Sequence, residues 1–389
     1  MQQLKYELIH GDTITHLSQI DKMVDVIFAD PPYFLSNGGK TMRGNRIVSV
    51  NKGEWDMGGT PEYIYEFNKK WLSLCRDVLK EDGTIWICGT FHNIYSVGLC
   101  LIELGYKILN VITWQKTDPP PSLTGTRFNF SSEFIIWAAK SNQSKYFLNF
   151  ELMKTINGGK QMNDVWKIPS VSWWEKLCGK HPTQKPLRLL YRIILSSTRQ
   201  GETILDPFAG SCTTGIAANL LGRNFIGIEQ DNRYIELGKR RKLYINDPII
   251  ANKMLFLMSE NPEETQVLIN HTNPDLQKKM IEKGITYMRA GDSRGSILIT
   301  PGFERMGYVL LHTNGNSCHL YKLKRTGCFQ IWTKETLEQY GFTPEHASYY
   351  MVLHFDNSQE IEITNNVQLR QGLNTYRSRI RPLSDFVGI

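Results

Sequence analysis

The sequence predicts a doubly wound α/β sheet followed by a separate, smaller domain. Two observations predict the sheet: short apolar runs alternate with amphipathic segments throughout residues 1–246, and the links between them are short. The apolar runs are nearly continuous, as in parallel strands buried on both faces. A third observation predicts the second domain, because the pattern changes to short β-like runs from about residue 276.

Each element follows from a local pattern. Apolar runs that stop at turn signals or acidic residues predict strands at 24–30, 83–89, 106–114, 133–139, 202–208 and 225–231. Apolar residues at helical spacing predict helices at 62–79, 93–105, 187–198 and 213–222. Residues 141–180 interrupt this rhythm with Gly, Pro and three Trp, which predicts a loop-rich insertion. We therefore expect a main domain at 1–246, a linker at 247–275 and a small α+β or β-rich domain at 276–389.

Composition excludes several classes of protein. The chain has 389 residues, 41% hydrophobic and 21% charged, which is typical of an ordinary globular protein. No run approaches the roughly 18 apolar residues that a membrane span needs, and the N-terminus does not resemble a signal peptide. The 7 Cys are scattered without a C-x-x-C pair, which argues against a disulfide scaffold or a structural zinc site. We expect a cytoplasmic protein without a metal and without a membrane partner.

The positive charge is confined to the first part of the chain. The net charge is +7, and residues 247–389 contribute none of it, because they hold 15 basic and 15 acidic residues. Residues 1–246 therefore carry the whole excess. A polyanionic partner for this part is consistent with that distribution.

The tetrapeptide Asp30-Pro31-Pro32-Tyr33 directly follows a predicted buried strand, where ligand crevices open in α/β sheets. An exocyclic amine on a base is a poor nucleophile, since its lone pair is delocalised into the ring. A carboxylate at Asp30 and the fixed carbonyl of Pro31 can each accept one N–H and direct that lone pair to attack. The prolines fix the backbone, and Tyr33 offers a face for stacking a base. The alternative is a strand that simply ends in a Pro-Pro turn.

A second motif runs from a predicted strand into a tight turn and then a helix. The turn consists of Asp206, Pro207, Phe208, Ala209, Gly210 and Ser211. Gly210 permits close approach of a ligand, and the helix N-terminus favours a carboxylate or phosphate. The pattern is neither G-x-G-x-x-G nor a Walker A loop, and Glu229 follows about 20 residues later at a spacing suited to ribose hydroxyls. Adenosine with a carboxylate-bearing group describes S-adenosylmethionine.

A third motif, His181-Pro182-Thr183-Gln184-Lys185-Pro186, immediately precedes a predicted helix. Polar groups between prolines are typical of a rigid loop, and a plain helix cap is the alternative.

The three motifs, in their chain order, resemble those of the β class of amino-methyltransferases that act on DNA. They read FADPPY, HPTQKP and LDPFAGSCTTG followed by GIE. The resemblance covers roughly residues 4–245. It includes Leu8 to Asp12, Gly53-Glu54-Trp55-Asp56, Gly89 to Tyr95, and Arg127-Phe128.

The resemblance implies a circularly permuted, Rossmann-like methyltransferase sheet. It is strongest to adenine-N6 enzymes of restriction–modification type, including the second methylases of DpnII-like systems and HinfI-like methylases. It implies catalysis at the DPPY motif, and cofactor contacts from Asp12, Thr183 and Lys185 besides Asp30, Asp206 to Ser211 and Glu229. Asp12 would lie near the adenine ring of the cofactor, and no metal is implied. Relatives often have Ser-Gly where this chain has Ser211-Cys212; we interpret Cys212 as packing, with a redox role as the alternative.

The implied reaction is direct methyl transfer to N6 of a flipped-out adenine, without a covalent enzyme intermediate. An Asp at position 30 favours adenine; an N4-cytosine enzyme, a catalytically silent DNA-binding protein and an RNA substrate are the alternatives. We expect a mobile loop at 35–50 to bring Lys40, Arg43 and Arg46 onto DNA phosphates, with a solvated basic loop as the alternative. Further DNA contacts are expected from Arg127 and from the target-recognition insertion, 141–180, with Lys154, Lys160, Lys167 and the three Trp (166, 173 and 174).

The expected partners are double-stranded DNA, with single-stranded DNA as a further substrate, and a second copy of the chain in a homodimer. A cognate restriction endonuclease without direct contact, in a bacterial or phage-encoded system near the nucleoid, is implied by the resemblance, as is GATC as the target sequence. The domain at 276–389 could contact DNA through the basic spots Lys322, Lys324 and Arg325, or Arg377, Arg379 and Arg381. Solvated surface is the alternative for both spots.

Overall fold

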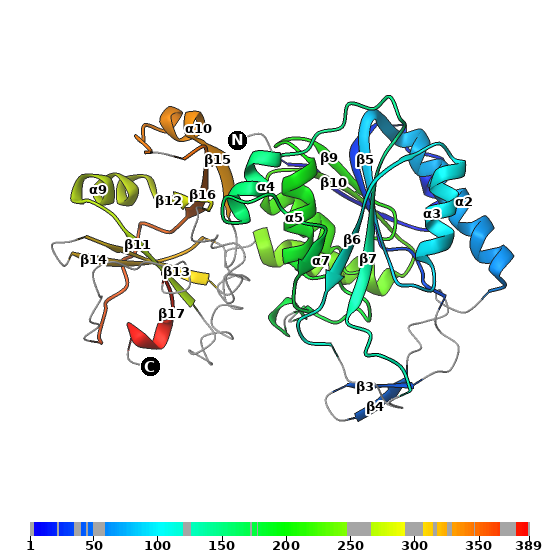
Figure 1. Cartoon of the computed structure of the whole chain (residues 1–389). Helices are drawn as coiled ribbons and strands as arrows, with labels where there is room; N and C mark the ends of the chain where they lie inside the picture. Colours follow the sequence, from blue (N-terminus) through cyan, green and yellow to red (C-terminus); the bar gives the residue numbers. More distant parts are fainter. Residues whose placement is uncertain are drawn as a thin grey trace. The chain divides into compact units, whose positions relative to one another are not determined.

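A computed structural model describes residues 4–21, 23–34, 40–43, 46–49, 59–119, 126–171, 173–176, 178–246, 266–291, 306–313, 317–324, 329–345, 347–365 and 379–387. The chain forms two compact units (Figure 1). The N-terminal unit comprises Met1–Asn149 and Asn163–Arg241, and the C-terminal unit comprises Phe150–Met162 and Lys242–Ile389. The seven-residue helix α4 (Phe150–Ile156), although it lies in the predicted insertion, is thus grouped with the C-terminal unit.

The N-terminal unit is built on an eight-stranded sheet in the order β1-β10-β9-β2-β5-β7-β6-β8. Its strands are β1 (Tyr6–His10), β2 (Val24–Ala29), β5 (Leu79–Gly89), β6 (Lys107–Gln115), β7 (Ser132–Ala139), β8 (Val165–Lys167), β9 (Thr203–Asp206) and β10 (Asn224–Glu229). The five strands from β1 to β5 in this order are parallel neighbours. By contrast, β7 pairs antiparallel with both β5 and β6. The predicted doubly wound α/β class is confirmed, and the reversed strand is a detail that the sequence did not reveal.

Helices cover both faces of this sheet (Figure 1). They are α1 (Thr13–Leu17), α2 (Pro61–Val78), α3 (Ile94–Glu103), α5 (Leu187–Ser197), α6 (Thr213–Leu220) and α7 (Asn232–Asn246). Helix α2 starts where Thr60 accepts the amide of Tyr63 at 3.3 Å and Pro61 sets the first turn. It buries Trp71, Leu72 and Cys75 among residues of α3, β2 and β5.

The sheet brings four acidic positions to one edge. Asp206 and Glu229 are the last residues of β9 and β10, Asp30 directly follows β2, and Asp12 follows β1. These four strands are neighbours in the order β1-β10-β9-β2 and run in the same direction. Because β7 runs the other way, its first residues, including Glu133, reach the same edge. Strand direction therefore decides which side chains can meet there.

The C-terminal unit holds two small sheets. One has the order β14-β13-β11-β17 and the other β12-β16-β15. The strands are β11 (Gln266–His271), β12 (Ile285–Arg289), β13 (Met306–His312), β14 (Cys318–Lys322), β15 (Gln330–Thr333), β16 (Tyr349–His354) and β17 (Ile380–Pro382), with helices α9 (Pro274–Lys283) and α10 (Lys334–Gln339). The expected α+β character is thus present.

Two boundary expectations need correction. Residues 266–275, expected in a linker, form the buried strand β11 and the start of α9, because Val267, Leu268 and Ile269 pack in the core of this unit. Residues 247–265 lie outside the described part of the chain. In the expected loop at 35–50, β3 (Lys40–Arg43) and β4 (Arg46–Ser49) pair as an antiparallel hairpin. Residues 35–39, 44–45 and 50–58, which include the Gly53 to Asp56 match, lie outside the described residues.

Within the described residues, no helix combines the length and apolarity needed to cross a bilayer. The same residues contain no group of three or more His, Cys, Asp or Glu side chains placed to hold a metal ion.

Candidate active site

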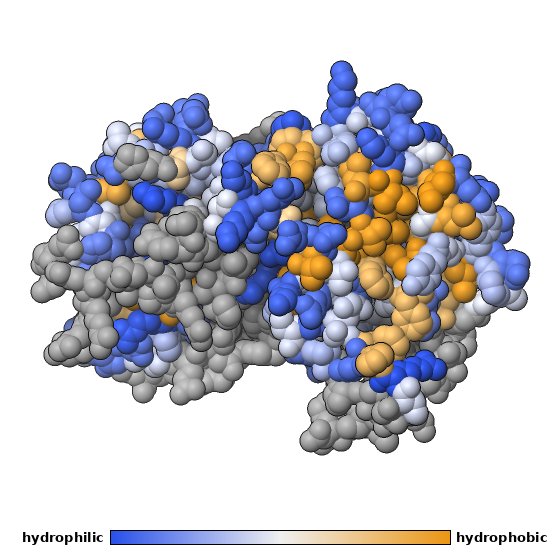
Figure 2. Space-filling model, viewed as in Figure 1, coloured by the Kyte–Doolittle hydropathy of each residue, from blue (hydrophilic) through white to orange (hydrophobic). Residues whose placement is uncertain are grey.

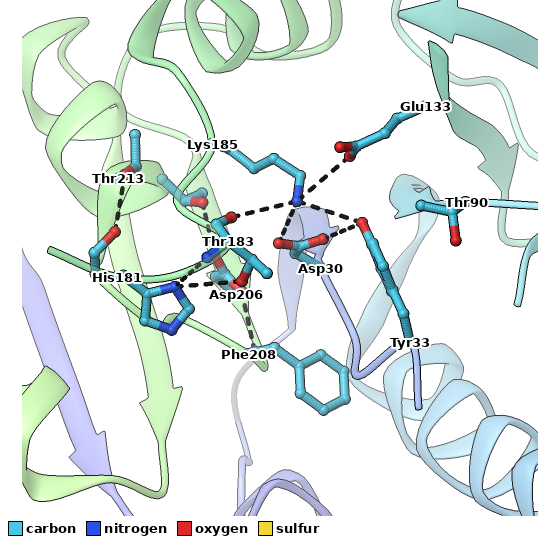
Figure 3. Close-up of polar contacts among 12 residues, drawn as sticks. Asp30, Tyr33, Thr90, Glu133, His181, Thr183, Lys185, Asp206, Phe208 and Thr213 are labelled. Carbon is cyan, nitrogen blue, oxygen red and sulfur yellow. Dashed lines mark hydrogen bonds and ion pairs between the residues drawn. The ribbon is translucent and has the colours of Figure 1, made fainter. Parts of the chain in front are cut away.

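Asp30 is held by two neighbours in the described structure. Its Oδ1 accepts the Tyr33 hydroxyl at 2.6 Å, and its Oδ2 accepts the Lys185 ammonium at 2.5 Å (Figure 3). Burial, then the Asp30 and Glu133 carboxylates, raise the pKa of Tyr33 well above its ordinary value, so its hydroxyl keeps its proton. The Tyr33 ring is buried, with Lys185 over it, so the expected open face for a base is covered here.

Lys185 lies at the centre of a buried group of charges. Its Nζ is 3.3 Å from the Tyr33 hydroxyl and 3.7 Å from Oε2 of Glu133. Burial alone would lower the pKa of Lys185, but the Asp30 and Glu133 carboxylates outweigh it, and the pKa lies above its ordinary value. The side chain is therefore a permanent ammonium at neutral pH. It was expected at the cofactor's methionine end, and the structure places it on the DPPY carboxylate.

Glu133 is a site residue that sequence reasoning missed. Its Oε1 is 2.5 Å from Nζ of Lys116 at the carboxyl edge of the sheet, and its Oε2 faces Lys185. The local sequence gives only a strand beginning at about this residue. The reversed direction of β7, which brings its start to the site, depends on pairing with β5 and β6. A Glu at the head of a buried strand was the one available signal.

The second sequence motif, Asp206 to Ser211, forms a tight turn around Asp206. One carboxylate oxygen accepts the Phe208 amide at 3.0 Å and the other accepts the Thr214 hydroxyl at 2.6 Å. Burial, with contributions from Asp30 and Glu229, raises the pKa of Asp206 to about 7. Glu229 accepts the amide of Gly210 at 2.8 Å. The predicted loop and the predicted ribose acid are thus hydrogen-bonded to each other.

Two residues of this turn have left-handed backbone. Gly210 has φ +50°, and a Cβ there would lie 3.2 Å from Nε2 of His181, so only glycine fits without displacing the ring. Cys212 has φ 57° and precedes α6. It is fully buried, and burial raises the pKa of its thiol to about 12, which opposes thiolate formation. The packing interpretation of Cys212 is favoured over a redox role.

A cavity of about 300 Å³ joins the motifs. Its lining includes these expected residues: Asp12, Asp30, Pro32, Thr183, Lys185, Asp206, Pro207, Phe208, Ala209, Gly210, Ser211 and Glu229. Aromatic side chains that were not predicted as site residues also line it: Phe34, Tyr63, Phe67, Tyr234 and His181, the first residue of the third motif. Asp12 caps α1 by accepting the Thr15 amide at 2.9 Å. The cavity therefore combines an acidic polar edge with an aromatic wall.

The residues that were expected to contact DNA differ in their exposure to solvent. Arg127, Lys160 and Lys167 are exposed. The side chains of Lys40, Arg43 and Arg46 lie outside what is described, as do those of Trp173 and Trp174. Trp166 was expected as a base contact and is instead buried, with its Nε1 donating to the Asn163 carbonyl at 3.0 Å. Its apolar ring packs near Trp86 in the core, which explains the difference.

An exposed aromatic group near Arg127 was also missed. Phe128 is 99% exposed, and Phe130 stacks on Phe91 with 5.0 Å between ring centroids. Phe91 follows the end of β5 and Phe130 precedes β7, so both lie at the edge that carries Asp30. Their spacing in sequence gives no hint of this meeting.

The cavity has an acidic residue at the end of each of two neighbouring strands, a glycine turn between them, and the Asp30 carboxylate beside them. Comparison with known proteins identifies the family. Residues 24–240 match the sequence model of the N6_N4_Mtase family, described as DNA methylase. The chain is 53% identical over 249 residues to the type II methyltransferase M2.MboI of Moraxella bovis, covering 64% of this chain and 91% of that protein. It is 52% identical over 239 residues to M2.DpnII of Streptococcus pneumoniae, covering 61% and 89%.

Among solved structures, the complex of M1.HpyAVI with SAM is 29% identical, with a TM-score of 0.47, and the match covers 60% of this chain and 98% of that one. The family match establishes that the chain belongs to the DNA methylase family. The protein is an adenine-specific DNA methyltransferase that uses S-adenosylmethionine, which confirms the predicted activity and cofactor. The family match ends at residue 240, beside the start of the C-terminal unit at Lys242.

Proposed function

We propose that Asp30 and the Pro31 carbonyl hold the exocyclic amine of a flipped-out adenine at the cavity that also receives the cofactor. The observation that carries this proposal is that Asp30, Asp206 and Glu229 line one cavity. S-adenosylmethionine supplies an electrophilic methyl group there. Glu229 and Asp12 suit its hydroxyl and amino groups, and the Gly210 turn leaves room for close approach. Thr183 and Lys185 complete the lining.

In this proposal the protein directs the lone pair of the amine. The two N–H groups of adenine donate to Asp30 and to Pro31, which would direct the nitrogen lone pair at the methyl carbon of a bound cofactor. As the carbon–nitrogen bond formed, the methyl–sulfur bond would break, S-adenosylhomocysteine would leave, and the methylated amine would lose one proton to solvent. The cysteines near the motifs, Cys88 and Cys212, are buried with pKa values raised by desolvation, which supports a reaction without a thiolate nucleophile. Unstacking the base costs a few kcal/mol, which contacts with the protein offset.

Asp30→Ala tests the proposal. We expect methyl transfer from radiolabelled S-adenosylmethionine to fall by more than about a thousandfold while cofactor affinity stays within about fivefold. Asp77→Ala, at an exposed position on α2, is the matched control and should keep wild-type activity. Retained turnover in Asp30→Ala contradicts the proposal. Mass spectrometry of the product nucleosides separates N6-methyladenine from N4-methylcytosine.

For DNA binding, we propose that Lys40, Arg43 and Arg46 on the β3–β4 hairpin, and Arg127, Lys160 and Lys167, contact phosphates. The exposure of the last three supports this. The double variant Arg43→Ala, Arg46→Ala should lower the salt dependence of duplex binding by about 0.9 for each phosphate that is no longer neutralised. An unchanged slope contradicts the role of the hairpin. Segment 141–180 would read the target, which we propose to be GATC; single-molecule sequencing of methylated DNA identifies it.

We also propose that the C-terminal unit contacts DNA through a polar cleft of about 420 Å³. Two guanidinium groups, Arg289 and Arg379, and one carboxylate, Glu345, line it, so its charge favours an anion. His271 also lines the cleft, and its Nδ1 lies 2.9 Å from Nδ1 of the buried His312. The cleft gives the neutral domain the local basic patch that contact with a phosphate backbone requires.

The two basic spots expected in this unit are described only in part. Lys322 and Lys324 belong to the described residues, whereas Arg325 lies outside them. In the second spot, Arg379 and Arg381 are described and Arg377 is not. Arg379 is the member that lines the cleft, so it carries the proposed contact.

For the oligomeric state, we propose a homodimer that uses the outer face of α3. Tyr95, Leu99 and Ile102 are exposed at helical spacing, with Val111 of β6 also exposed. Figure 2 shows hydrophobic residues gathered on the face where α3, β6 and β7 lie in Figure 1. Leu99→Glu should shift the mass measured by light scattering from dimer to monomer. A monomeric wild-type protein contradicts this proposal.

The proposals on the remaining partners and on localisation rest on membership of the family. We propose that single-stranded DNA is also a substrate, because a base outside the stack does not need its pairing strand at Asp30. We further propose that the enzyme is cytoplasmic and associated with the nucleoid. Its system would include a cognate restriction endonuclease that the enzyme does not contact. Methyl transfer to single-stranded oligonucleotides tests the proposed substrate. Co-purification with the tagged protein from its host tests whether the endonuclease is bound.

A further inference from the structure

The Lys185 ammonium lies between two carboxylates that come from opposite directions along the sheet. It is 2.5 Å from Oδ2 of Asp30, which follows β2, and 3.7 Å from Oε2 of Glu133, which begins β7 (Figure 3). The exposed fractions of the three side chains are 6%, 14% and 13%. All three charges are therefore largely withdrawn from water. In the protein interior the attraction between opposite charges is stronger than in water.

Both oxygens of Asp30 are engaged in this arrangement. Oδ1 accepts the Tyr33 hydroxyl and Oδ2 accepts Lys185. The proposed reaction requires the same carboxylate to accept an N–H of the adenine amine. A carboxylate oxygen already bound to an ammonium is a weaker acceptor for a neutral amine, because the ammonium offsets the negative charge that makes the carboxylate a strong acceptor. The amine and Lys185 thus compete for Asp30.

Glu133 provides a second place for the ammonium. A buried ammonium withdrawn from Asp30 without another anion would be uncompensated and strongly destabilising. Glu133 is fixed by Lys116, whose Nζ lies 2.5 Å from its Oε1, while its Oε2 faces Lys185. The flexible four-carbon stem of a lysine allows a shift of roughly 1 Å to hydrogen-bond distance without a backbone movement.

The charge of the group stays balanced during such a shift. Lys116 and Lys185 carry two positive charges, and Asp30 and Glu133 carry two negative ones. Adenine enters as a neutral base. Moving the ammonium from one carboxylate to the other therefore creates no net charge in the interior.

We propose that Glu133 is a positioning residue that receives the Lys185 ammonium when the adenine amine binds Asp30. Lys185 occupies Asp30 while no base is present, and Glu133 stabilises the ammonium once it leaves. The amine then meets a carboxylate that it does not share with a cation. This inference rests on the proposed role of Asp30 and adds two residues, one of them outside every motif of the sequence.

The first measurement is single-turnover methyl transfer by the full-length Glu133→Gln enzyme on a duplex substrate. Gln keeps the size of the side chain and a hydrogen-bond acceptor for Lys116 but removes the charge. We expect the rate to fall at least tenfold, with S-adenosylmethionine affinity within twofold of wild type. Glu81→Gln is the matched control, because Glu81 pairs with the buried Lys140 at 2.7 Å on β5, at residues outside the cavity lining. It should keep the wild-type rate.

A double-mutant cycle with Lys185→Met separates this role from a structural one. Without an ammonium to receive, Glu133 has no task, so Glu133→Gln should change the rate of the Lys185→Met enzyme by less than twofold. Glu133→Asp, which keeps the charge, should recover part of the loss. Rate losses that multiply in the double variant overturn the inference. If Glu133→Gln fails to bind S-adenosylmethionine, the cycle is run with Glu133→Asp, whose smaller loss should again vanish beside Lys185→Met.

The Asp30→Ala enzyme distinguishes failure of the proposed role of Asp30 from failure of the proposed role of Glu133. If Asp30→Ala retains turnover, the proposed function itself is wrong. If Asp30→Ala is inactive but the cycle is multiplicative, Asp30 keeps its role and only the transfer of Lys185 to Glu133 is wrong.

Discussion

The two units each contain a polar cleft, and the clefts are built in different ways. The cavity of the N-terminal unit is lined by acidic groups at the ends of neighbouring parallel strands and by a glycine turn. The cleft of the C-terminal unit is lined by guanidinium groups of Arg289 and Arg379, which lie far apart in sequence. The first is lined mostly by residues of the family match, with Asp12 and Thr13 before its start, and the second lies outside the match. In the first cleft the glycine turn allows a ligand to approach the backbone closely. In the second cleft the charge of side chains would attract a ligand.

Of the changes that compare the two clefts, the largest effect on binding is expected from Gly210→Ala. The added Cβ would lie 3.2 Å from Nε2 of His181 at a residue with φ +50°, which costs roughly 1–2 kcal/mol before any ligand binds. We expect cofactor affinity, measured by calorimetry, to fall at least tenfold. Gly98→Ala on α3 is the control, because its Cβ would meet only Ile136 at 3.8 Å. Unchanged affinity in Gly210→Ala would show that the turn does not approach the cofactor.

The next effect concerns the second cleft. The double variant Arg289→Ala, Arg379→Ala should weaken duplex binding about tenfold at low salt and lower the salt slope by about 0.9 for each phosphate that these cations neutralise. Cofactor affinity should be unchanged. Lys278→Ala, an exposed cation of α9 outside the cleft lining, is the control. Equal binding by the double variant and the control would leave the cleft without a role in DNA contact.

A smaller effect is expected from Phe128→Ala. The ring is 99% exposed, so its removal should leave the thermal unfolding midpoint within about 1 °C of wild type. Stacking of an aromatic ring on a base contributes about 1–3 kcal/mol, and we expect DNA affinity to fall at least fivefold. Anisotropy measurements with a labelled duplex test this. An affinity equal to wild type assigns the exposed ring no part in DNA binding.

A last prediction concerns the pH dependence of stability and not ligand binding. Burial raises the pKa of Asp206 to about 7, above its unfolded value, so the folded state binds more protons than the unfolded state between these values. Stability should therefore fall as pH rises from about 4 to about 7. Asp206→Asn removes this contribution, so wild type should lose free energy of unfolding relative to the variant across this range. Urea denaturation without cofactor measures the difference, and parallel pH curves for the two proteins contradict it.

The positions that were predictable share one property: their signal is local. Asp30, Asp206 and Glu229 each end a buried strand or follow it directly, and parallel strands bring such ends together. Glu133 was not predictable, because the direction of β7 is set by pairing with distant strands. Strand β11 was assigned to a linker because its short apolar run lies between Glu-rich and Asn-Pro segments. Trp166 was misjudged because burial of an aromatic depends on tertiary packing.

The reversed direction of β7 also divides the site for protein engineering. The groups proposed to hold the cofactor lie at the ends of β9 and β10 or just after β9, whereas Ser132 and Glu133 are the first residues of β7 at the same edge. A library at the head of β7 thus varies the surroundings of the reacting base while the cofactor turn keeps its sequence. Selectivity between bases and retention of the methyl donor become separate design variables on one sheet.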